Sequence, residues 1–182
     1  MYWQKIKLKT CDNIYEPKED SYLLAQEVER YAFGKVLDLG TGTGIQGIVA
    51  AKKGCNVTFS DINAKALECA KANAELNNVN GRFVKSDMFS RIKGTFNTII
   101  FNPPYLPNEG EDTDMALDGG SNGRRYIDEF ILEYKKHIGK DYVVLMLESS
   151  LDKYSQDLKE GFEIAASESF FFEELVVLKA EN

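Results

Sequence analysis

Short apolar segments alternate along this chain with longer amphipathic ones, and this alternation restricts the fold more than any other feature of the sequence. We predict strands at residues 36–39, 56–60, 82–85, 96–101 and 142–147. We predict helices at residues 19–31, about 45–52, 61–77, 124–137 and 151–159. Strands that alternate with helices indicate an α/β fold with a mostly parallel, doubly wound sheet.

Two segments at the ends of the chain extend this plan. Residues 162–171 and 174–179 follow one another without a helix between them, which predicts a closing antiparallel hairpin. Residues 6–8 alternate in polarity and predict a short edge strand. We expect one domain over residues 1–182, in which residues 1–31 form an N-terminal extension and a cap helix packed on the core.

Composition and charge exclude several function classes. No run of about 18 apolar residues is present and the first residues lack the apolar core of a signal peptide, so we expect no contact with a membrane. A net charge of −7 makes a nucleic-acid partner unfavourable, because proteins that grip nucleic acid usually carry a basic stripe. His137 is the single histidine, which removes support for Ser–His and Cys–His hydrolases.

The cysteines bear on metal binding and on location. Cys11, Cys55 and Cys69 are odd in number and have no metal-ligand spacing, so no metal site is expected. We interpret all three as reduced, mostly buried thiols, which predicts a cytoplasmic protein.

A glycine-rich turn, Asp-Leu-Gly-Thr-Gly-Thr-Gly, joins the first core strand to its helix. Glycines permit a tight turn and let the backbone approach a ligand closely. The context of strand, turn and helix is typical of sites for cofactors derived from nucleotides. We assign to cofactor binding the turn residues Asp38, Gly40, Thr41, Gly42 and Gly44. Asp38 is expected to bind a cofactor amine directly or to orient the loop.

Carboxylates also follow the next two strands. Asp61, with Ile62 beside it, comes about 20 residues after the glycines, where a carboxylate accepts hydrogen bonds from ribose hydroxyls. The alternative for Asp61 is a helix N-cap. Asp87 can accept from an adenine amine and Met88 can pack on the ring, although an ordinary strand end is the alternative there. These residues predict a cofactor with an adenosine half and do not separate NAD from S-adenosylmethionine.

The tetrapeptide Asn102-Pro103-Pro104-Tyr105 follows the strand at 96–101, at the edge of the sheet where α/β folds bind ligands. Two prolines fix φ and remove two backbone donors, which makes a stiff arch with outward carbonyls. The Asn102 side-chain oxygen and the Pro103 carbonyl can accept the two hydrogens of a planar NH2 group, and the Tyr105 ring can stack on its plane. A proline turn without a ligand is the alternative. The element suits methyl transfer to nitrogen better than hydride transfer, which favours S-adenosylmethionine over NAD.

Together these motifs resemble the HemK/PrmC-like glutamine N5-methyltransferases, and within them the short archaeal and eukaryotic branch. The segment from Tyr15 to Ser21 is similar to that branch's Tyr-Glu-Pro-x-Glu-Asp-Thr element, with Ser21 in place of Thr. The glycine turn matches as well, although the family often has Glu at the position of Asp38. Residues 118–124 are similar to its Gly-Gly-x-x-Gly-Arg segment. The resemblance spans nearly the whole chain.

The resemblance implies a Rossmann-like class I S-adenosylmethionine-dependent methyltransferase, with a seven-stranded, mostly parallel sheet and an antiparallel C-terminal hairpin. It implies S-adenosylmethionine as cofactor and S-adenosylhomocysteine as product. It adds four residues to the expected cofactor contacts, namely Tyr15, Asp20, Ser21 and Asn102. It implies catalytic roles for Asn102, Pro103 and Tyr105. It implies substrate contacts for Pro104, Gly120 and Arg124.

The resemblance also implies a substrate and a partner. The substrate is the glutamine of the Gly-Gly-Gln segment in a class I translation release factor. The partner is a small zinc-binding activator protein at the sheet edge beside the third strand. Three alternatives stay open: methylation of adenine N6 or cytosine N4 in RNA or DNA, methylation of a small molecule, and a cofactor-binding scaffold without catalysis. Pro17 and the acidic residues after it also match a plain helix start, and residues 119–124 also match a loop entering a helix.

Overall fold

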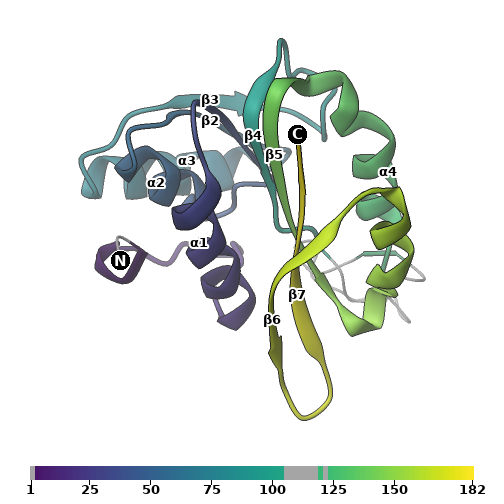
Figure 1. Ribbon diagram of the computed structural model, residues 1–182. Helices are drawn as coiled ribbons and strands as arrows, with labels where there is room; N and C mark the ends of the chain where they lie inside the picture. The colour runs from purple at the N-terminus through teal and green to yellow at the C-terminus, as the bar shows by residue number, and fades with distance from the viewer. Residues whose placement is uncertain (1–2, 105–118, 121–122) are drawn as a thin grey trace.

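The computed structural model describes residues 3–104, 119–120 and 123–182 (Figure 1). Its strands are β1 (Lys35–Leu39), β2 (Asn56–Asp61), β3 (Arg82–Lys85), β4 (Phe96–Phe101), β5 (Ile138–Ser149), β6 (Glu163–Ser169) and β7 (Glu174–Glu181). Its α-helices are α1 (Glu19–Tyr31), α2 (Ile45–Lys52), α3 (Ala64–Leu76) and α4 (Arg125–Glu133). Short 3-10 helices are η1 (Trp3–Lys5), η2 (Tyr134–His137), η3 (Ser150–Asp152) and η4 (Tyr154–Glu160).

In this part of the chain, seven strands form one sheet in the order β3-β2-β1-β4-β5-β7-β6. The pairs from β3 to β5 are parallel, whereas β7 runs antiparallel to both β5 and β6. The predicted fold class is therefore confirmed, including the antiparallel hairpin at the C-terminal end. The chain leaves β1 in one direction for β2 and later returns on its other side as β4. In open α/β sheets, ligands bind at such a reversal, outside the carboxyl ends of the strands.

Each face of the sheet carries its own core. Val143 and Leu145 of β5 pack into the core under α1 and α2, while Val144 and Met146 between them pack into the core under α4. Figure 1 shows α1, α2 and α3 on one side of the sheet and α4 on the other. Parallel strands covered on both faces read as continuous apolar runs, which is why residues 142–147 could be recognised as a strand.

The prediction of a strand at residues 6–8 is wrong. The backbone there binds side chains of α3 and of its C-cap, Asn77: the Lys7 N–H donates to Asn77 Oδ1 at 3.0 Å, and the Asn77 amide donates back to the Lys7 carbonyl at 2.7 Å. The Lys9 N–H donates in the same way to Asn73 Oδ1 at 2.8 Å. Two side-chain amides on a helix thus take the place of a strand ladder.

Helix boundaries also differ from prediction at three places. α3 begins at Ala64 instead of residue 61, because Asn63 Oδ1 accepts from the Lys65 N–H at 3.0 Å and caps the helix. The helix predicted at 124–137 changes from α to 3-10 after Glu133. The α-helix predicted at 151–159 is replaced by the 3-10 helices η3 and η4, which are separated by Lys153 in a left-handed conformation.

The prediction of three reduced cysteines is wrong for two of them. Cys11 and Cys69 form a disulfide that ties the N-terminal segment to α3, and Cys55 is a partly buried free thiol. The two paired cysteines lie 58 positions apart in sequence, and only the path of the N-terminal segment along α3 brings them together. None of the helices described is both long and apolar enough to cross a membrane.

Candidate active site

A cavity of about 780 Å³ opens at the carboxyl ends of the parallel strands. The turn after β1, the ends of β2 and β3, the segment after β4 and the segment before α1 all contribute to its wall. The predicted site residues that line it are Tyr15, Asp20, Ser21, Asp38, Gly40, Thr41, Gly42, Asp61, Ile62, Asp87, Met88, Asn102, Pro103 and Pro104. Residues spread over 90 positions of sequence are thus brought to one cavity, whose volume is in the range of cofactor sites.

The glycine turn after β1 is fixed by its own backbone. The Thr41 N–H donates to the Ser60 carbonyl at 2.8 Å, and the Gly42 N–H donates to Asp61 Oδ2 at 3.0 Å. Gly42 has a φ of 53°, in the left-handed region that glycine adopts without strain. The turn of β1 is therefore attached directly to the end of β2.

Gly44 differs from the other predicted turn residues because it is not among the residues that line the cavity. It precedes α2 with a φ of 88°, and a Cβ there would lie 3.1 Å from the Cα of Ala70 in α3. Gly44 therefore allows the start of α2 to pack closely against α3. The glycine pattern in the sequence does not distinguish this packing role from a ligand contact.

Asp38 lies at the end of β1, buried beneath the turn. Its Oδ2 accepts hydrogen bonds from Thr41 Oγ1 at 2.5 Å and from the Gly47 N–H at 2.9 Å. Burial raises the pKa of Asp38 to about 7, against the opposing effect of these two hydrogen bonds. Of the two roles expected for Asp38, these contacts make it the residue that orients the loop, and its position in the cavity wall leaves the other role available.

Asp61 ends β2 at the cavity. Besides the Gly42 N–H, it accepts the Asn63 N–H at 2.9 Å through Oδ1. Burial raises the pKa of Asp61, with hydrogen bonds from Asn63, Gly42 and Ile62 acting in the opposite direction. The N-cap of α3 is Asn63, so the alternative reading of Asp61 as the helix cap does not hold.

Asp87 and Met88 belong to a tight turn after β3. The Ser86 hydroxyl donates to the Met88 carbonyl at 2.9 Å and accepts from the Arg91 N–H at 2.9 Å. Met88 has a φ of 39°, an uncommon conformation for a side chain of this size. The turn leaves Asp87 exposed and buries most of Met88, and both residues line the cavity.

The segment after β4 meets the start of α1. Asn102 Nδ2 donates to Asp20 Oδ2 at 3.0 Å and lies 3.5 Å from Ser21 Oγ, while the Tyr15 hydroxyl donates to Asp20 Oδ1 at 3.0 Å. Because a carboxylate only accepts, the nitrogen end of the Asn102 amide must face Asp20. Asn102 Oδ1 is then buried without a hydrogen-bond partner among the residues described. Buried polar atoms without partners are rare in native proteins and point to a ligand group.

Three further residues were predicted to belong to the site: Tyr105, Gly120 and Arg124. Tyr105 is outside the described residues. Gly120 has a φ of 81°, and its carbonyl accepts a hydrogen bond from the Gly123 N–H. Neither Gly120 nor Arg124 is among the residues that line the cavity. The Arg124 side chain is only 6% exposed.

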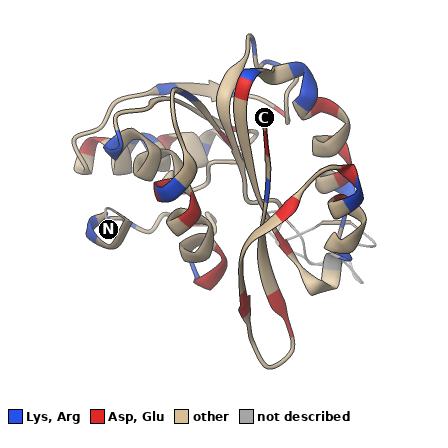
Figure 2. Cartoon of the chain, viewed as in Figure 1, with Lys and Arg blue, Asp and Glu red and all other residues tan. Residues whose placement is uncertain are grey.

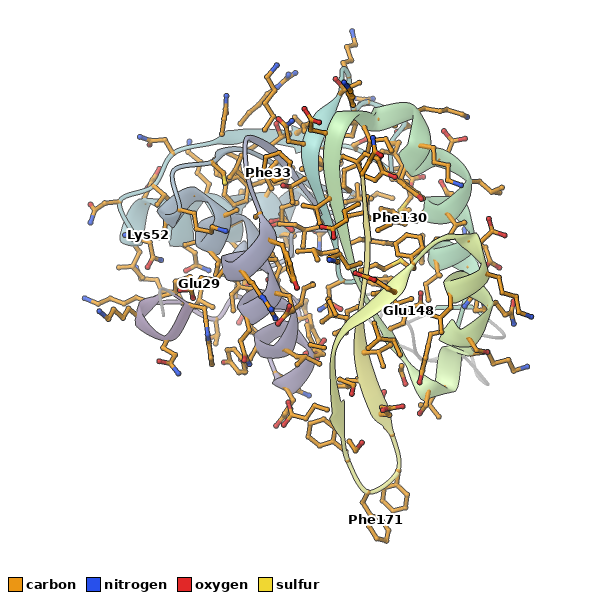
Figure 3. The ribbon with its side chains drawn as sticks, viewed as in Figure 1. Glu29, Phe33, Lys52, Phe130, Glu148 and Phe171 are labelled. Atoms are coloured by element: carbon orange, nitrogen blue, oxygen red, sulfur yellow. A yellow bond between two sulfur atoms is a disulfide. The ribbon has the colours of Figure 1, made fainter. Side chains whose placement is uncertain are left out.

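Arg124 is held by a group of carboxylates between α4, β5 and η4. Its guanidinium lies 2.9 Å from Asp128, 3.4 Å from Glu148 and 2.9 Å from Asp157. Burial lowers the pKa of Arg124, but the three carboxylates outweigh it and raise the pKa. Figure 3 shows Glu148 inside the body of the protein, which agrees with its complete burial. This arrangement differs from the substrate contact predicted for Arg124.

Several residues of the cavity wall were not predicted. Among them are Ile14, Gln46, Phe101 and Tyr126. Gln46 donates through Nε2 to the Ser21 carbonyl at 2.9 Å, which joins α2 to the start of α1. Phe101 could have been found as the last strand residue before Asn102, whereas Gln46 and Tyr126 give no local signal because helix faces alone do not show which side meets a ligand.

A Rossmann-like sheet with a glycine turn, two acidic strand ends and an Asn-Pro-Pro segment around one cavity defines a methyltransferase of class I. Residues 15–163 match the model of the family described as the methyltransferase small domain, and this chain belongs to that family.

Individual relatives agree with this placement. A protein of Methanocaldococcus jannaschii with the provisional name protein N5-glutamine methyltransferase is 43% identical over 96% of this chain and 95% of its own. A release factor glutamine methyltransferase of Deinococcus radiodurans is 32% identical over 66% of this chain and 49% of that protein, so the chain spans about half of that relative. The solved Mtq2-Trm112 complex of E. cuniculi, described as responsible for methylation of the eRF1 translation termination factor, matches with a TM-score of 0.76 and 28% identity over 93% of this chain and 99% of that chain.

Proposed function

We propose that this protein transfers a methyl group from S-adenosylmethionine to the side-chain amide nitrogen of the glutamine in the Gly-Gly-Gln segment of a class I translation release factor. One observation carries the proposal: Asn102 Oδ1 is a buried acceptor without a partner among the described residues, and Asp20 holds the Asn102 amide in the orientation that presents it. An NH2 group is the natural partner of such an acceptor. The names of the relatives from M. jannaschii and D. radiodurans point to the same reaction.

The cavity fits S-adenosylmethionine, which supplies an electrophilic methyl group. The turn around Gly40 and Gly42 lets a ligand approach the backbone, and Asp38 beneath it lies where a cofactor ammonium can pair with a carboxylate. Asp61 would accept hydrogen bonds from the ribose hydroxyls, as carboxylates after the second strand of such folds commonly do. Asp87 would accept from the adenine amine and Met88 would pack on the ring.

The chemistry required of the protein is mainly orientation. A carboxamide nitrogen is a poor nucleophile because its lone pair is delocalised into the carbonyl. Asn102 Oδ1 and the Pro103 carbonyl would accept its two hydrogens and direct the lone pair at the methyl group. As positive charge builds on the nitrogen, these acceptors stabilise the transition state more than the ground state. The proton becomes acidic only after attack, so a strong general base is unnecessary, and Tyr105 would stack on the amide.

A small zinc-binding activator is the partner we propose, in the cytoplasm where release factors act. The likeness to the chain of the Mtq2-Trm112 complex supports a small partner protein. β3 is an edge strand of only four residues, 82–85, and offers unpaired backbone groups to such a protein. Disulfides are uncommon in that compartment, so the state of the Cys11–Cys69 pair should be measured in protein taken directly from cells.

The first experiment incubates the purified protein with radiolabelled S-adenosylmethionine and the release factor of the same organism, with and without a Gln→Ala change in its Gly-Gly-Gln segment. We expect label on the wild-type factor and none on the variant. If label instead reaches RNA or DNA, and not the factor even with a zinc-binding activator present, then the nucleobase alternative is the function.

A second experiment tests the role of Asn102. The variant Asn102→Ala should bind the cofactor and lose turnover by at least about 100-fold, as typically follows removal of one oriented polar group. Unchanged turnover in this variant would contradict the mechanism even if the release factor is the substrate.

A further inference from the structure

The turn between β6 and β7 exposes an aromatic pair to solvent. The Phe171 side chain is 92% exposed and that of Phe172 86%, whereas most phenylalanines of the described chain are buried. Their ring centroids lie 4.6 Å apart at an interplanar angle of 89°, an edge-to-face pair. The Phe170 N–H donates to the Glu173 carbonyl at 2.7 Å and closes the turn. The two rings are therefore held together before any partner arrives.

This tip lies beyond the same edge of the sheet as the cavity. Leu178 of β7 pairs with Met146, which pairs in turn with Phe101 at the end of β4. β7 begins at Glu174, four residues before Leu178, so at about 3.3 Å per residue the strand extends about 13 Å past that level, and Phe171 lies in the turn beyond it. Figure 3 shows Phe171 at the far end of the hairpin, pointing away from the body of the protein. A ligand that fills the cavity cannot also reach the tip, but a protein substrate can.

The charge around the tip is uniformly acidic. Residues 160–178 contain five glutamates and no lysine or arginine. Glu168, Glu173 and Glu174 flank the aromatic pair, and Figure 2 shows acidic positions on both strands of the hairpin. Such a surface repels a nucleic-acid backbone and also a second copy of this chain, whose net charge is −7. It fits a protein surface that is apolar and basic.

We propose that the β6–β7 tip is a docking surface for the protein substrate, which it binds through an apolar and basic patch away from the acceptor glutamine. This inference rests on the proposed function, because the occupant is the release factor that presents its glutamine to Asn102. Exposed aromatic residues are frequent energetic centres of protein interfaces. The cavity then selects the chemical group, and the tip raises affinity for the protein that carries it.

The test compares wild type with the double variant Phe171→Ser/Phe172→Ser, using the full-length release factor. We expect KM for the factor to rise about tenfold or more, because truncation of an interface hot spot typically weakens binding by at least this much. The kcat and the affinity for the cofactor should stay unchanged. The matched control is Leu132→Ser, an apolar side chain of α4 that is 76% exposed and should leave KM unchanged. A second variant, Glu168→Gln/Glu173→Gln, should raise KM and weaken its dependence on salt.

The outcomes separate the two proposals. If wild type does not methylate the factor, the proposed function fails. If wild type methylates it and the phenylalanine variant has an unchanged KM, the docking inference alone is overturned. A variant that changes the oligomeric state in light scattering while KM stays constant would identify the tip as a contact between copies of this chain, and would also overturn it.

Discussion

The side chain of Asn102 donates a hydrogen bond of 3.0 Å to Asp20, a residue 82 positions earlier in the sequence. The carboxylate is almost fully buried, and Tyr15 occupies its other oxygen. Both carboxylate oxygens of Asp20 thus accept hydrogen bonds from residues of the site. The start of α1 therefore sets the orientation of the Asn102 amide.

Replacement of Asp20 by asparagine should reduce turnover without unfolding the protein. The new amide can donate as well as accept, so it no longer dictates which end of the Asn102 amide faces the cavity. We expect kcat to fall by about 10- to 100-fold, because a small misplacement of a catalytic group has effects of this size. The control is Glu19→Gln, which makes the same change of charge at an exposed neighbour and should retain activity. Full activity of Asp20→Asn would show that the orientation of Asn102 is set elsewhere.

Asp38 should make stability depend on pH. Its pKa is raised by burial from 3.8 to about 7, so between these values the folded protein binds a proton that the unfolded chain releases. The contribution of this group to the free energy of unfolding is therefore full below pH 4 and is lost as pH rises through 7.

The variant Asp38→Asn isolates that contribution, because it keeps an acceptor for Thr41 and Gly47 and cannot ionise. In urea denaturation, the variant should gain stability relative to wild type as pH rises from 5 to 7, by up to about 1.4 kcal/mol per pH unit. The gain should level off above pH 7. A difference between the two proteins that is constant from pH 5 to pH 8 contradicts the assigned pKa.

We expect replacement of Arg124 to lower the stability of the folded protein. Replacement by methionine removes the ion pairs of Arg124 with two buried carboxylates, Glu148 and Asp157, which we expect to lower the free energy of unfolding by about 3–5 kcal/mol. Arg125→Met at the exposed neighbouring position should change it by less than about 0.5 kcal/mol. Arg124→Lys decides the role: normal stability with a strongly raised KM for the release factor would favour the substrate contact predicted from the sequence over the structural role.

The disulfide should affect both stability and cofactor binding. Cys11→Ser removes a link that closes a long loop, and a loss of about 2–4 kcal/mol is typical of such links. Asn13 and Ile14 adjoin Cys11 and line the cavity, so cofactor affinity measured by calorimetry should also fall. Dithiothreitol should reproduce both effects in wild type and in the control Cys55→Ser. If it changes neither, the pair does not hold this wall of the cavity.

Much of the fold could be predicted because buried parallel strands are locally distinct. The predicted bounds of β3 and β4 agree with the structure, since an apolar or alternating run is closed at both ends by polar residues or glycine. The sequence predicts an α-helix at 151–159, where the structure has 3-10 helices, because the same residue types suit both and only packing against the sheet decides between them.

In the site, too, residues at strand ends could be predicted, whereas contacts between distant segments could not. Asp38, Asp61 and Asn102 could be found because each lies at or next to the last residue of a strand, and parallel strands bring their carboxyl ends to one edge. The bond between Asp20 and Asn102, the pairing of Cys11 with Cys69 and the carboxylates around Arg124 all join distant segments. No local sequence pattern encodes such contacts. The residues around Asp20 are fully explained as the start of a helix, so they give no sign of the hydrogen bond to Asn102.

The position of β7 bears on how the chain is assembled during synthesis. β7 is made after β6 and yet lies between β5 and β6. Until β7 leaves the ribosome, both of its neighbours present open edges, and β6 has no partner in the sheet. A nascent chain stalled before residue 174 would therefore lack an interior strand, and its exposed edges would be open to pairing with other chains.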